Sequence, residues 1–353
     1  MPTRVTINGR FLTRPATGVD RFAFEVLRCW LPTYGADSSA RIVVPRNVPC
    51  HDGGEFPAAH SVGKLGGHGW EQLELPVFCR DDMLVSLCNT GPIAQRLHLA
   101  VLHDAGAIVN ASTYSYSFRT WYRVLFAGLM RRASIIATVS DFSASELMRH
   151  FGRSAARIEV ISESGEHILR ATADPRVLER LNLKGRRYVL CVGSRAANKN
   201  FGAIVRAAAM LSDLAVEVVA VGGSNGRVFA DPAPNATNLV LAGYVSDGEL
   251  RALYENAQCF VFPSLYEGFG LPPLEAMHCG CPAIVSSRAA LPEVCGDGAL
   301  YCDPDDPVDI ARQLRRVLSS QSLRRELRDR GFARVRSFSW KKAADHLQHL
   351  LTR

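Results

Sequence analysis

The sequence predicts an α/β protein with two domains, each a doubly wound parallel sheet with helices on both faces. The first observation is that short apolar runs alternate with longer helical patterns in both halves of the chain, as parallel sheets require. The second is the length of 353 residues, which suffices for two domains of ordinary size. The third is a charged stretch, 166–187, which lacks a strand pattern and marks the expected passage between the domains.

The first series of elements occupies the N-terminal half. Helical spacing of apolar residues predicts helices over 19–31, 115–132 and 143–150, and Asp141 is a suitable cap for the last of them. Six short apolar runs predict strands, namely 5–7, 41–44, 83–87, 99–102, 135–139 and 158–161.

The second series follows the charged stretch and shows the same alternation. Helices are expected over 201–211, 247–256 and 308–318, with Asp247 as the cap of the second. A final helix is expected over 338–353, where apolar residues recur at helical spacing. Five apolar runs predict strands, namely 188–192, 216–221, 239–242, 259–262 and 283–285.

Composition indicates a soluble globular protein, because 47% of the residues are apolar and 21% are charged. The apolar run 5–7 is too short for the core of a signal peptide, and no apolar stretch approaches the roughly 18 residues of a transmembrane helix. The 10 cysteines are scattered without a Cys-x-x-Cys pair. We therefore expect a protein of the reducing cytoplasm, without a disulfide framework or a zinc site.

The net charge of +7 fits either an anionic substrate or an anionic membrane surface. Residues 105–140 contain four arginines, no acidic residue and many aromatic residues. Such a basic, aromatic helix can lie at the inner face of a membrane, but its aromatic face can equally be core with the arginines in solvent. Nucleic acid is not an expected partner, because the arginines are not dense enough for a tracking groove.

The stretch 259–285 carries the most functional information. A buried strand runs into a turn that holds Glu267, and a helix opened by Pro272 then carries Glu275. The N-terminus of a helix after a glycine-bearing loop is suited to binding phosphate. Carboxylates cannot serve the phosphate, so the two glutamates indicate hydroxyl groups and hence a ligand with both a diphosphate and a sugar. Taken singly, each glutamate could be only a cap or an exposed first-turn acid.

This arrangement resembles the Glu-x7-Glu motif of retaining glycosyltransferases of family 4, which have the two-domain GT-B fold. The resemblance implies that Glu267 faces the transferred sugar and acts in catalysis. It also implies that the backbone amides of Phe269, Gly270 and Leu271 meet sugar and phosphate, and that Glu275 binds the ribose of the nucleotide.

The stretch 189–200 resembles the family's phosphate-binding turn. A buried strand runs into Gly193, and Lys199 stands where the family places one of two cations that neutralise the diphosphate. Positive charge is needed there because the leaving nucleoside diphosphate gains charge in the transition state. Asn198 stands where the family usually has the second cation, an arginine, and Arg195 could substitute for it. Without the glutamate motif, Lys199 would be taken for a solvated turn residue.

Other parts of the site follow from the resemblance. His103 comes after a strand, where open α/β sheets place ligands, and the family puts it in the active site without making it an obvious general base. The stretch 14–21, which contains Gly18, resembles the N-terminal loop of a bacterial O-antigen mannosyltransferase-like subgroup, in which this glycine lies against diphosphate and acceptor. Val245, in 243–246, would flank the nucleotide. The stretches 69–72 and 89–92 also resemble that subgroup, and no independent role for Glu71 and Gln72 follows from the sequence.

The resemblance implies two Rossmann-like domains that face each other across a cleft. The acceptor domain would be 1–168, with the helix 338–353 crossing back onto it, and the donor domain would be 169–337. A hexosyl unit, for which mannose from GDP-mannose is one option, would pass to a lipid-linked saccharide or polysaccharide. We expect no metal and no cofactor besides the nucleotide sugar, because the Asp-Pro-Asp sequence at 303–305 is typical of a turn.

Two alternatives belong to other classes. A dinucleotide-dependent oxidoreductase is suggested by Gly268 and Gly270 before a helix, but Pro273 replaces the third glycine and no acid ends a strand about twenty residues on. A GT-B subunit that binds or scaffolds without catalysis is suggested only by Asn198. The presence of both glutamates and Lys199 argues against it.

Overall fold

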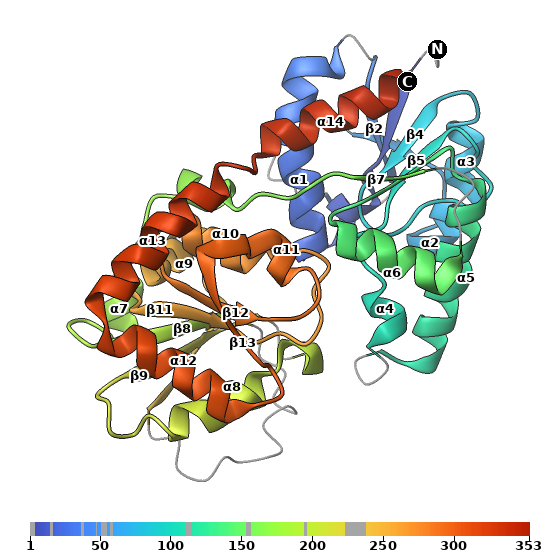
Figure 1. Ribbon diagram of the computed structural model, residues 1–353. Helices are drawn as coiled ribbons and strands as arrows, with labels where there is room; N and C mark the ends of the chain where they lie inside the picture. The colour runs from blue at the N-terminus through green and yellow to red at the C-terminus, as the bar shows by residue number, and fades with distance from the viewer. Residues whose placement is uncertain are drawn as a thin grey trace. The chain divides into compact units, whose positions relative to one another are not determined.

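The computed structural model describes residues 4–14, 17–36, 39–46, 48–50, 55–56, 59–110, 114–152, 157–193, 196–222 and 238–353. The chain divides into two compact units, which are considered separately. Unit 1 comprises Met1–Glu163 and Trp340–Arg353, and unit 2 comprises Ser164–Ser339. Each is an α/β unit built on a parallel sheet (Figure 1).

The sheet of unit 1 has seven parallel strands in the order β3-β2-β1-β4-β5-β6-β7. Its strands are β1 (Val5–Asn8), β2 (Arg41–Pro45), β3 (His60–Val62), β4 (Met83–Ser86), β5 (His98–Val101), β6 (Ile135–Thr138) and β7 (Ile158–Val160). Chain order reverses between β1 and β4, and this switch point is where sheets of this kind place ligands, at the carboxyl ends of the strands.

Helices cover both faces of this sheet. Leu125 and Phe126 of α5 pack with Ala100 and Ile136 of the sheet. The helices of unit 1 are α1 (Gly18–Trp30), α2 (Gly67–Gly69), α3 (Leu75–Phe78), α4 (Gly106–Val109), α5 (Tyr116–Arg132), α6 (Asp141–Phe151) and α14 (Trp340–Thr352). The unit also contains a 3-10 helix, η1 (Gly9–Thr13), and the π-helices η2 (Leu31–Gly35) and η3 (Trp70–Glu74).

The C-terminal helix α14 belongs to unit 1, although it follows unit 2 in the chain. Trp340 is fully buried and meets the ring of Phe22 of α1 edge-on, with 6.1 Å between ring centroids. The indole N–H of Trp30 donates to Gln348 Oε1 over 2.9 Å. Burial of two tryptophans along one seam supplies the apolar area that holds this helix against α1.

The sheet of unit 2 has six parallel strands in the order β10-β9-β8-β11-β12-β13. The strands are β8 (Tyr188–Val192), β9 (Glu217–Val221), β10 (Leu239–Gly243), β11 (Cys259–Phe262), β12 (Ala283–Ser286) and β13 (Ala299–Cys302). Its helices are α7 (Arg176–Arg180), α8 (Phe201–Ala209), α9 (Asp247–Asn256), α10 (Leu271–His278), α11 (Leu291–Cys295), α12 (Pro307–Ser319) and α13 (Gln321–Val335), with η4 (Glu166–Arg170), η5 (Ala197–Lys199) and η6 (Gly296–Gly298).

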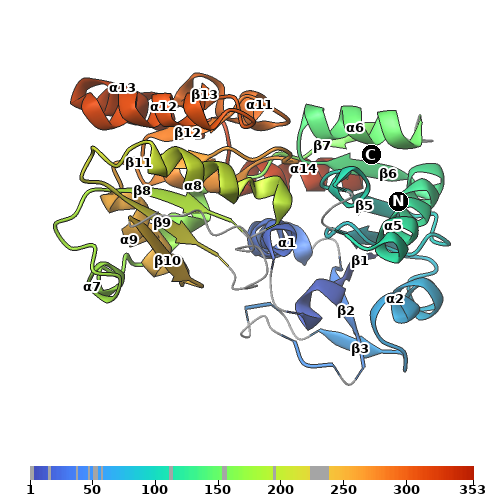
Figure 2. The same cartoon turned by 90° about the horizontal axis from the view of Figure 1, so that it is seen from below.

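The helices of unit 2 lie on both faces of its sheet (Figures 1 and 2). Val261 of β11 points into the core formed with α8 and α12. Its neighbour Phe260 meets Tyr254 of α9 instead, with 5.6 Å between ring centroids. Successive residues of a strand point to opposite faces, so α9 covers the face opposite α8 and α12.

All eleven predicted strands are found, each with its ends within one residue of the prediction. Two short edge strands, β3 and β13, were missed. β3 consists of His60, Ser61 and Val62, two of which are exposed, so it has no apolar run to detect. α13 was also missed, because seven of its 15 residues are charged and only Leu327, Gly331 and Val335 are buried.

The predicted helix caps are wrong by one residue. Ser246 caps α9, where its hydroxyl accepts from Glu249 N and the Glu249 side chain accepts from Ser246 N. Ser140 caps α6 in the same way by accepting from Ser143 N. Both residues precede the aspartates named from the sequence, and serine and aspartate are similarly good caps, so propensity alone does not choose between them.

The division between the units lies before the expected 168/169. Gly165 lies against the backbone of α10, since a Cβ atom there would be 2.5 Å from Glu275 N. His167 Nε2 is 3.0 Å from Glu275 Oε1. These contacts place 164–168 with unit 2, and Phe338 also packs there, against Phe269 at 5.7 Å between ring centroids.

Candidate active site

A pocket opens in unit 2 at the carboxyl ends of four neighbouring strands. β8, β9, β10 and β11 each end at its wall, which is the edge where open α/β sheets bind ligands. The wall comprises Cys191, Val192, Gly193, Lys199, Phe201, Ile204, Ala220, Val221, Gly222, Leu241, Gly243, Val261, Phe262 and Pro263. Most of these are apolar or glycine, so the charge of Lys199 dominates the lining.

Lys199 and Glu267 form an ion pair at this pocket. Lys199 Nζ lies 2.7 Å from Glu267 Oε1 and 5.3 Å from the centroid of the Phe262 ring. The hydroxyl of Ser264 donates to the same carboxylate oxygen over 2.5 Å. The side chains of Lys199 and Glu267 keep 24% and 11% of their surface exposed. The structure thus brings together two residues that are 68 positions apart and leaves both accessible to a ligand.

Asn198 connects the loop of Lys199 to the loop of Glu267 through hydrogen bonds. Its carbonyl oxygen accepts from Leu265 N over 2.7 Å and lies 2.8 Å from Ser264 Oγ. Its side-chain amide donates to Tyr266 O over 3.2 Å. Asn198 therefore fixes Lys199 relative to Glu267 through neutral hydrogen bonds. Arg195, named from the sequence as a substitute cation, lies outside the described residues.

Two neighbours of Lys199 shape the same turn. Asn200 adopts a left-handed backbone with φ of 56°, and its side-chain amide donates to Pro263 O and Pro304 O. Gly193 lies beneath the Lys199 side chain, because a Cβ atom at this glycine would be 3.5 Å from Lys199 Cγ. A side chain at Gly193 would therefore contact the aliphatic part of Lys199.

The helix α10 begins at Leu271, four residues after Glu267. Gly270 caps it with a φ of 111°, a conformation that disfavours any side chain. Phe269 and Leu271 are buried, at 4% and 9% exposure. The first backbone N–H groups of a helix have no partner within it. Pro272 and Pro273 have no N–H, so the donors at this end of α10 are those of Gly270 and Leu271, and the helix dipole also favours an anion there.

Glu275 lies one turn further along α10 and is 8% exposed. Its Oε1 is 3.0 Å from His167 Nε2, and its Oε2 accepts from the Tyr254 hydroxyl over 3.1 Å. Burial lowers the pKa of His278, a neighbour of this carboxylate, to about 4. The charge of His167 also lowers this pKa, and the charge of Glu275 opposes the shift. Glu275 is thus an internally bonded carboxylate and not an exposed first-turn acid. Its binding of a ribose stays a prediction.

Val245 is buried and immediately precedes the cap of α9, whereas Tyr244 beside it is 89% exposed.

In unit 1, Gly18 is the first residue of α1, and a Cβ atom there would meet nothing within 4 Å. Asp20 closes this helix end by accepting from Thr17 N over 2.9 Å. The space around Gly18 is open, and its predicted contact with diphosphate and acceptor stays a prediction.

The ring of His103 is buried in unit 1, and both of its nitrogens have partners. Nε2 lies 2.9 Å from Leu87 O, and Nδ1 lies 3.2 Å from Glu163 Oε1. Burial opposes protonation, but the hydrogen bond and charge of Glu163 and the Leu87 carbonyl raise the pKa of His103. Both ring nitrogens thus lie against groups of unit 1 in this structure. A catalytic function of His103 stays a prediction.

Metal ligands are not gathered in the described part of the chain, where no group of three or more His, Cys, Asp or Glu side chains could hold an ion. Asp303 and Asp305, in the turn that resembles a metal motif, both pair with Arg288. Among the described residues, no helix combines the length and apolarity that crossing a membrane requires.

Sequence reasoning missed Ser264, which bonds Glu267, and Asn198 as the link between the two loops. The only sequence signal for them is their position next to the two motifs. It also assigned nothing to Glu71, which is fully buried.

Comparison with known proteins bears on the same region. Residues 176–334 match the family model described as glycosyl transferases group 1. The O-antigen chain mannosyltransferase B of Escherichia coli is 37% identical over 220 residues, which are 59% of this chain and 58% of the relative. The chain therefore spans less than two thirds of the length of that relative.

Two solved structures share the fold over nearly the whole chain. Sucrose-phosphate synthase from Thermosynechococcus elongatus has a TM-score of 0.74 at 18% identity and covers 99% of this chain and 98% of its own. HepE from Anabaena, in complex with UDP and glucose, has a TM-score of 0.72 at 14% identity and covers 100% of both chains. The likeness confirms the expected GT-B fold class.

Proposed function

We propose that the chain transfers a hexosyl unit, with retention, from a nucleoside-diphosphate sugar, and the match of residues 176–334 to the glycosyl transferases group 1 model supports this. The observation that carries this proposal is the Lys199–Glu267 pair at the pocket of unit 2, beside the N-terminus of α10. A cation, a carboxylate and the start of a helix meet there, which matches the diphosphate and hydroxyl groups of such a donor.

Each residue has a distinct part in the proposed site. Lys199 neutralises the charge that develops on the leaving diphosphate, and Gly193 leaves room for it. The amides of Phe269, Gly270 and Leu271 contact the sugar and phosphate. Glu267 accepts from sugar hydroxyls, and Glu275 accepts from the ribose with lone pairs not used by His167 and Tyr254. Val245 flanks the nucleotide.

Mannose is the proposed sugar and a lipid-linked saccharide or polysaccharide the proposed acceptor, in the synthesis of a cell-surface glycan. The support is the similarity to the O-antigen chain mannosyltransferase B of Escherichia coli. The acceptor would bind unit 1, which contains Gly18. Lys199 supplies the cation at the diphosphate, so we expect transfer to continue in excess chelator. Loss of activity on chelation, restored by Mg²⁺ or Mn²⁺, would contradict this expectation.

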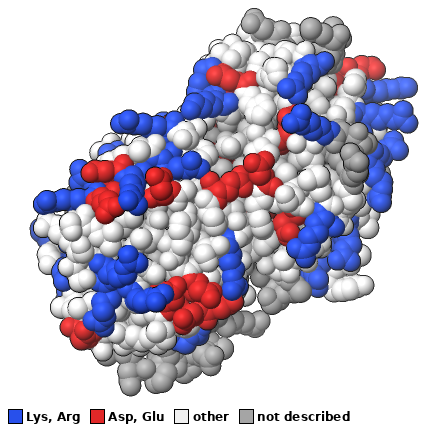
Figure 3. All heavy atoms as spheres, viewed as in Figure 1, with Lys and Arg blue, Asp and Glu red and all other residues white. Residues whose placement is uncertain are grey.

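Contact with an anionic membrane is a further part of the proposal. Tyr116 of α5 is 81% exposed and Val124 55%, and Arg123, Arg131 and Arg132 of the same helix are exposed. Figure 3 shows mainly basic side chains along one edge of the face drawn, and mixed charges elsewhere. Such a surface favours an anionic bilayer. Sedimentation with phosphatidylglycerol vesicles, and not with phosphatidylcholine vesicles, is expected; equal binding to both would count against it.

The direct test is calorimetric titration with GDP-mannose, UDP-glucose, dTDP-glucose and ADP-glucose. At least one is expected to bind, and Lys199→Met should weaken that binding about tenfold or more, because a charge-assisted contact with phosphate is lost. The matched control is Lys184→Met, since Lys184 is a solvent-exposed lysine of the same unit, paired with Glu179. Unchanged affinity in Lys199→Met would remove that residue from the site.

A further inference from the structure

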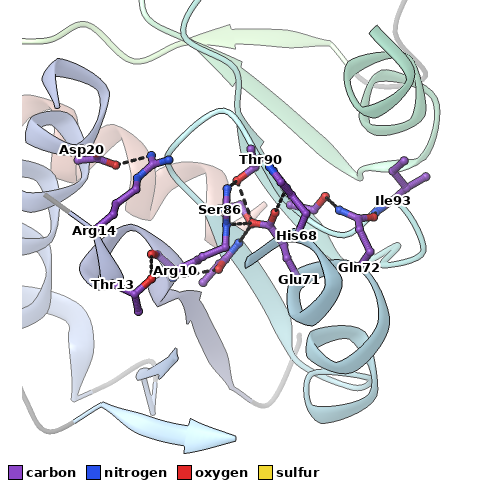
Figure 4. Close-up of polar contacts among 12 residues, drawn as sticks. Arg10, Thr13, Arg14, Asp20, His68, Glu71, Gln72, Ser86, Thr90 and Ile93 are labelled. Carbon is purple, nitrogen blue, oxygen red and sulfur yellow. Dashed lines mark hydrogen bonds and ion pairs between the residues drawn. The ribbon is translucent and has the colours of Figure 1, made fainter. Parts of the chain in front are cut away.

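A buried carboxylate organises a polar cluster in unit 1. Glu71 has no exposed surface, and its Oε1 accepts from Asn8 Nδ2 over 2.7 Å and from the Thr90 hydroxyl over 2.8 Å. Arg10 Nε lies 3.2 Å from the same oxygen (Figure 4). Burial alone would raise the pKa of Glu71, but the hydrogen bond of His68, the Arg10 charge and the other donors lower it. The carboxylate is therefore held ionised inside the unit.

The second oxygen of this carboxylate orients a histidine at the surface. His68 Nδ1 lies 3.2 Å from Glu71 Oε2, and the His68 side chain is 35% exposed. An ionised carboxylate only accepts hydrogen bonds, so Nδ1 carries the proton. In the neutral ring Nε2 is then an acceptor, and the hydrogen bonds among the described residues do not use it. A carboxylate behind a histidine fixes tautomer and orientation in this way at many functional sites.

Aromatic rings flank this histidine. The ring centroid of Trp121 lies 5.3 Å from that of His68, and the centroid of Tyr122 lies 6.3 Å from it. Trp121 is partly exposed, whereas the other three tryptophans, Trp30, Trp70 and Trp340, are fully buried. The Trp121 indole N–H is a buried donor without a partner among the described residues. One face of Tyr122 is covered by Phe118, with 4.3 Å between ring centroids, so Trp121 is the ring beside His68 that best suits a sugar, which has apolar C–H faces and polar edges.

We propose that His68, oriented by Glu71 and flanked by Trp121 and Tyr122, binds the saccharide of the acceptor. His68 Nε2 accepts a hydrogen bond from a sugar hydroxyl, and the Trp121 ring packs against the C–H face. This inference rests on the proposed function, since it names the residues of unit 1 that hold the second substrate. His68 orients the sugar by this bond, and no proton transfer is assigned to it.

A purely structural explanation accounts for only part of the cluster. Asn8, Arg10 and Thr90 already satisfy the buried side of Glu71. A partly exposed His68 adds little to stability, because exposed ion pairs contribute about 0–1 kcal/mol. A loss of sugar binding without a loss of stability is therefore the signature that separates recognition from packing.

The probe is octyl α-mannoside, which combines a sugar with an alkyl chain. Its binding is followed by tryptophan fluorescence, for which Trp121 is the partly exposed tryptophan, and its use as acceptor is followed in transfer kinetics with the best donor. His68→Ala should raise the KM for octyl α-mannoside about tenfold, as expected for a lost hydrogen bond and ring contact. The donor Kd and the melting temperature should stay unchanged. His68→Gln, which keeps an acceptor atom, should restore part of the loss.

The matched control is His150→Ala. His150 is also a partly exposed histidine of unit 1, and its Nε2 lies 3.6 Å from Glu146 Oε2 on α6. This variant should behave as the wild type in every measurement. Wild-type acceptor kinetics in His68→Ala, or no fluorescence response of the wild type to octyl α-mannoside, would overturn the inference. If no nucleotide sugar binds the wild type, the proposed function fails first; if donors bind and react but His68→Ala is normal, the inference alone fails.

Discussion

Glu267 in unit 2 and Glu71 in unit 1 each lie beside a cation, but at different depths. The side chains of Lys199 and Glu267 are 24% and 11% exposed, whereas those of Arg10 and Glu71 are 12% and 0% exposed. The first pair lies at a pocket beside a helix N-terminus, where a ligand can share its charges. The second is surrounded by hydrogen-bond donors of its own unit.

The comparison shows that burial determines what a carboxylate–cation pair can do. A pair that keeps exposed surface can exchange its internal contact for a substrate, at little cost in stability. A buried pair cannot do so, because removing either partner leaves an uncompensated charge. Glu71 can therefore act only through a neighbour, and His68 is the neighbour that reaches the surface.

The largest expected difference is in stability. Glu71→Ala should lower the free energy of unfolding of unit 1 by about 3–5 kcal/mol, because Arg10 loses its carboxylate and the buried donors of Asn8 and Thr90 lose their acceptor. Glu267→Ala should cost about 1 kcal/mol or less, since Lys199 retains contact with solvent. Urea unfolding of both variants measures this. Equal losses would contradict the distinction between the two glutamates.

A second prediction concerns the histidine that the sequence placed in the active site. Because the Glu163 contact outweighs burial, the pKa of His103 should lie above its ordinary 6.5. Its contribution to stability is then fully present below pH 6.5 and is lost as the pH rises through the folded-state pKa. NMR titration of the ring tests this, and Glu163→Gln should lower the value. A pKa below 6.5 would exclude the ion pair with Glu163.

His98, in the same unit, gives the opposite behaviour. Burial lowers the pKa of His98 to about 4, so the unfolded state binds a proton before the folded state does. Its contribution to stability is lost as the pH falls from 6.5 to about 4. In one NMR titration the pKa of His103 should lie above 6.5 and the pKa of His98 below it, so each histidine is an internal control for the other.

The smallest predicted effect concerns a helix cap. Ser246→Ala should cost about 1 kcal/mol, because Glu249 N loses its acceptor at the start of α9. Asp247→Ala, the matched variant at the position named from the sequence, should cost only the few tenths expected of an acid in the first turn. The opposite order in thermal unfolding would show that the aspartate is the cap.

Sequence reasoning predicted the central strands because burial on both faces makes each one a continuous apolar run. It missed β3 and α13, which are polar and lie where little of their surface is buried. It found Glu267 because strand, turn and helix of that motif are contiguous. The Glu71 cluster could not be found this way, since Asn8, Arg10, His68, Thr90 and Trp121 are brought together only by the order of the strands.

The same limit applies within unit 2. The sequence named Glu275 but not its burial, because His167 and Tyr254 reach it from separate segments. The sequence named His103 in the same way but not its contact with Glu163. A residue at the end of a strand can point to a ligand or into the unit, and only the position of Glu163 decides between them.

The central claim is that Glu267 and Lys199 form the site of sugar transfer from a nucleotide donor. The most direct measurement is the rate of transfer to octyl α-mannoside by Glu267→Gln and the wild type, with donor binding measured on the same samples. We expect the variant to bind the donor and to transfer about 10²- to 10³-fold more slowly, the usual effect of losing a preorganised electrostatic contact. A variant that transfers at the wild-type rate would contradict this assignment.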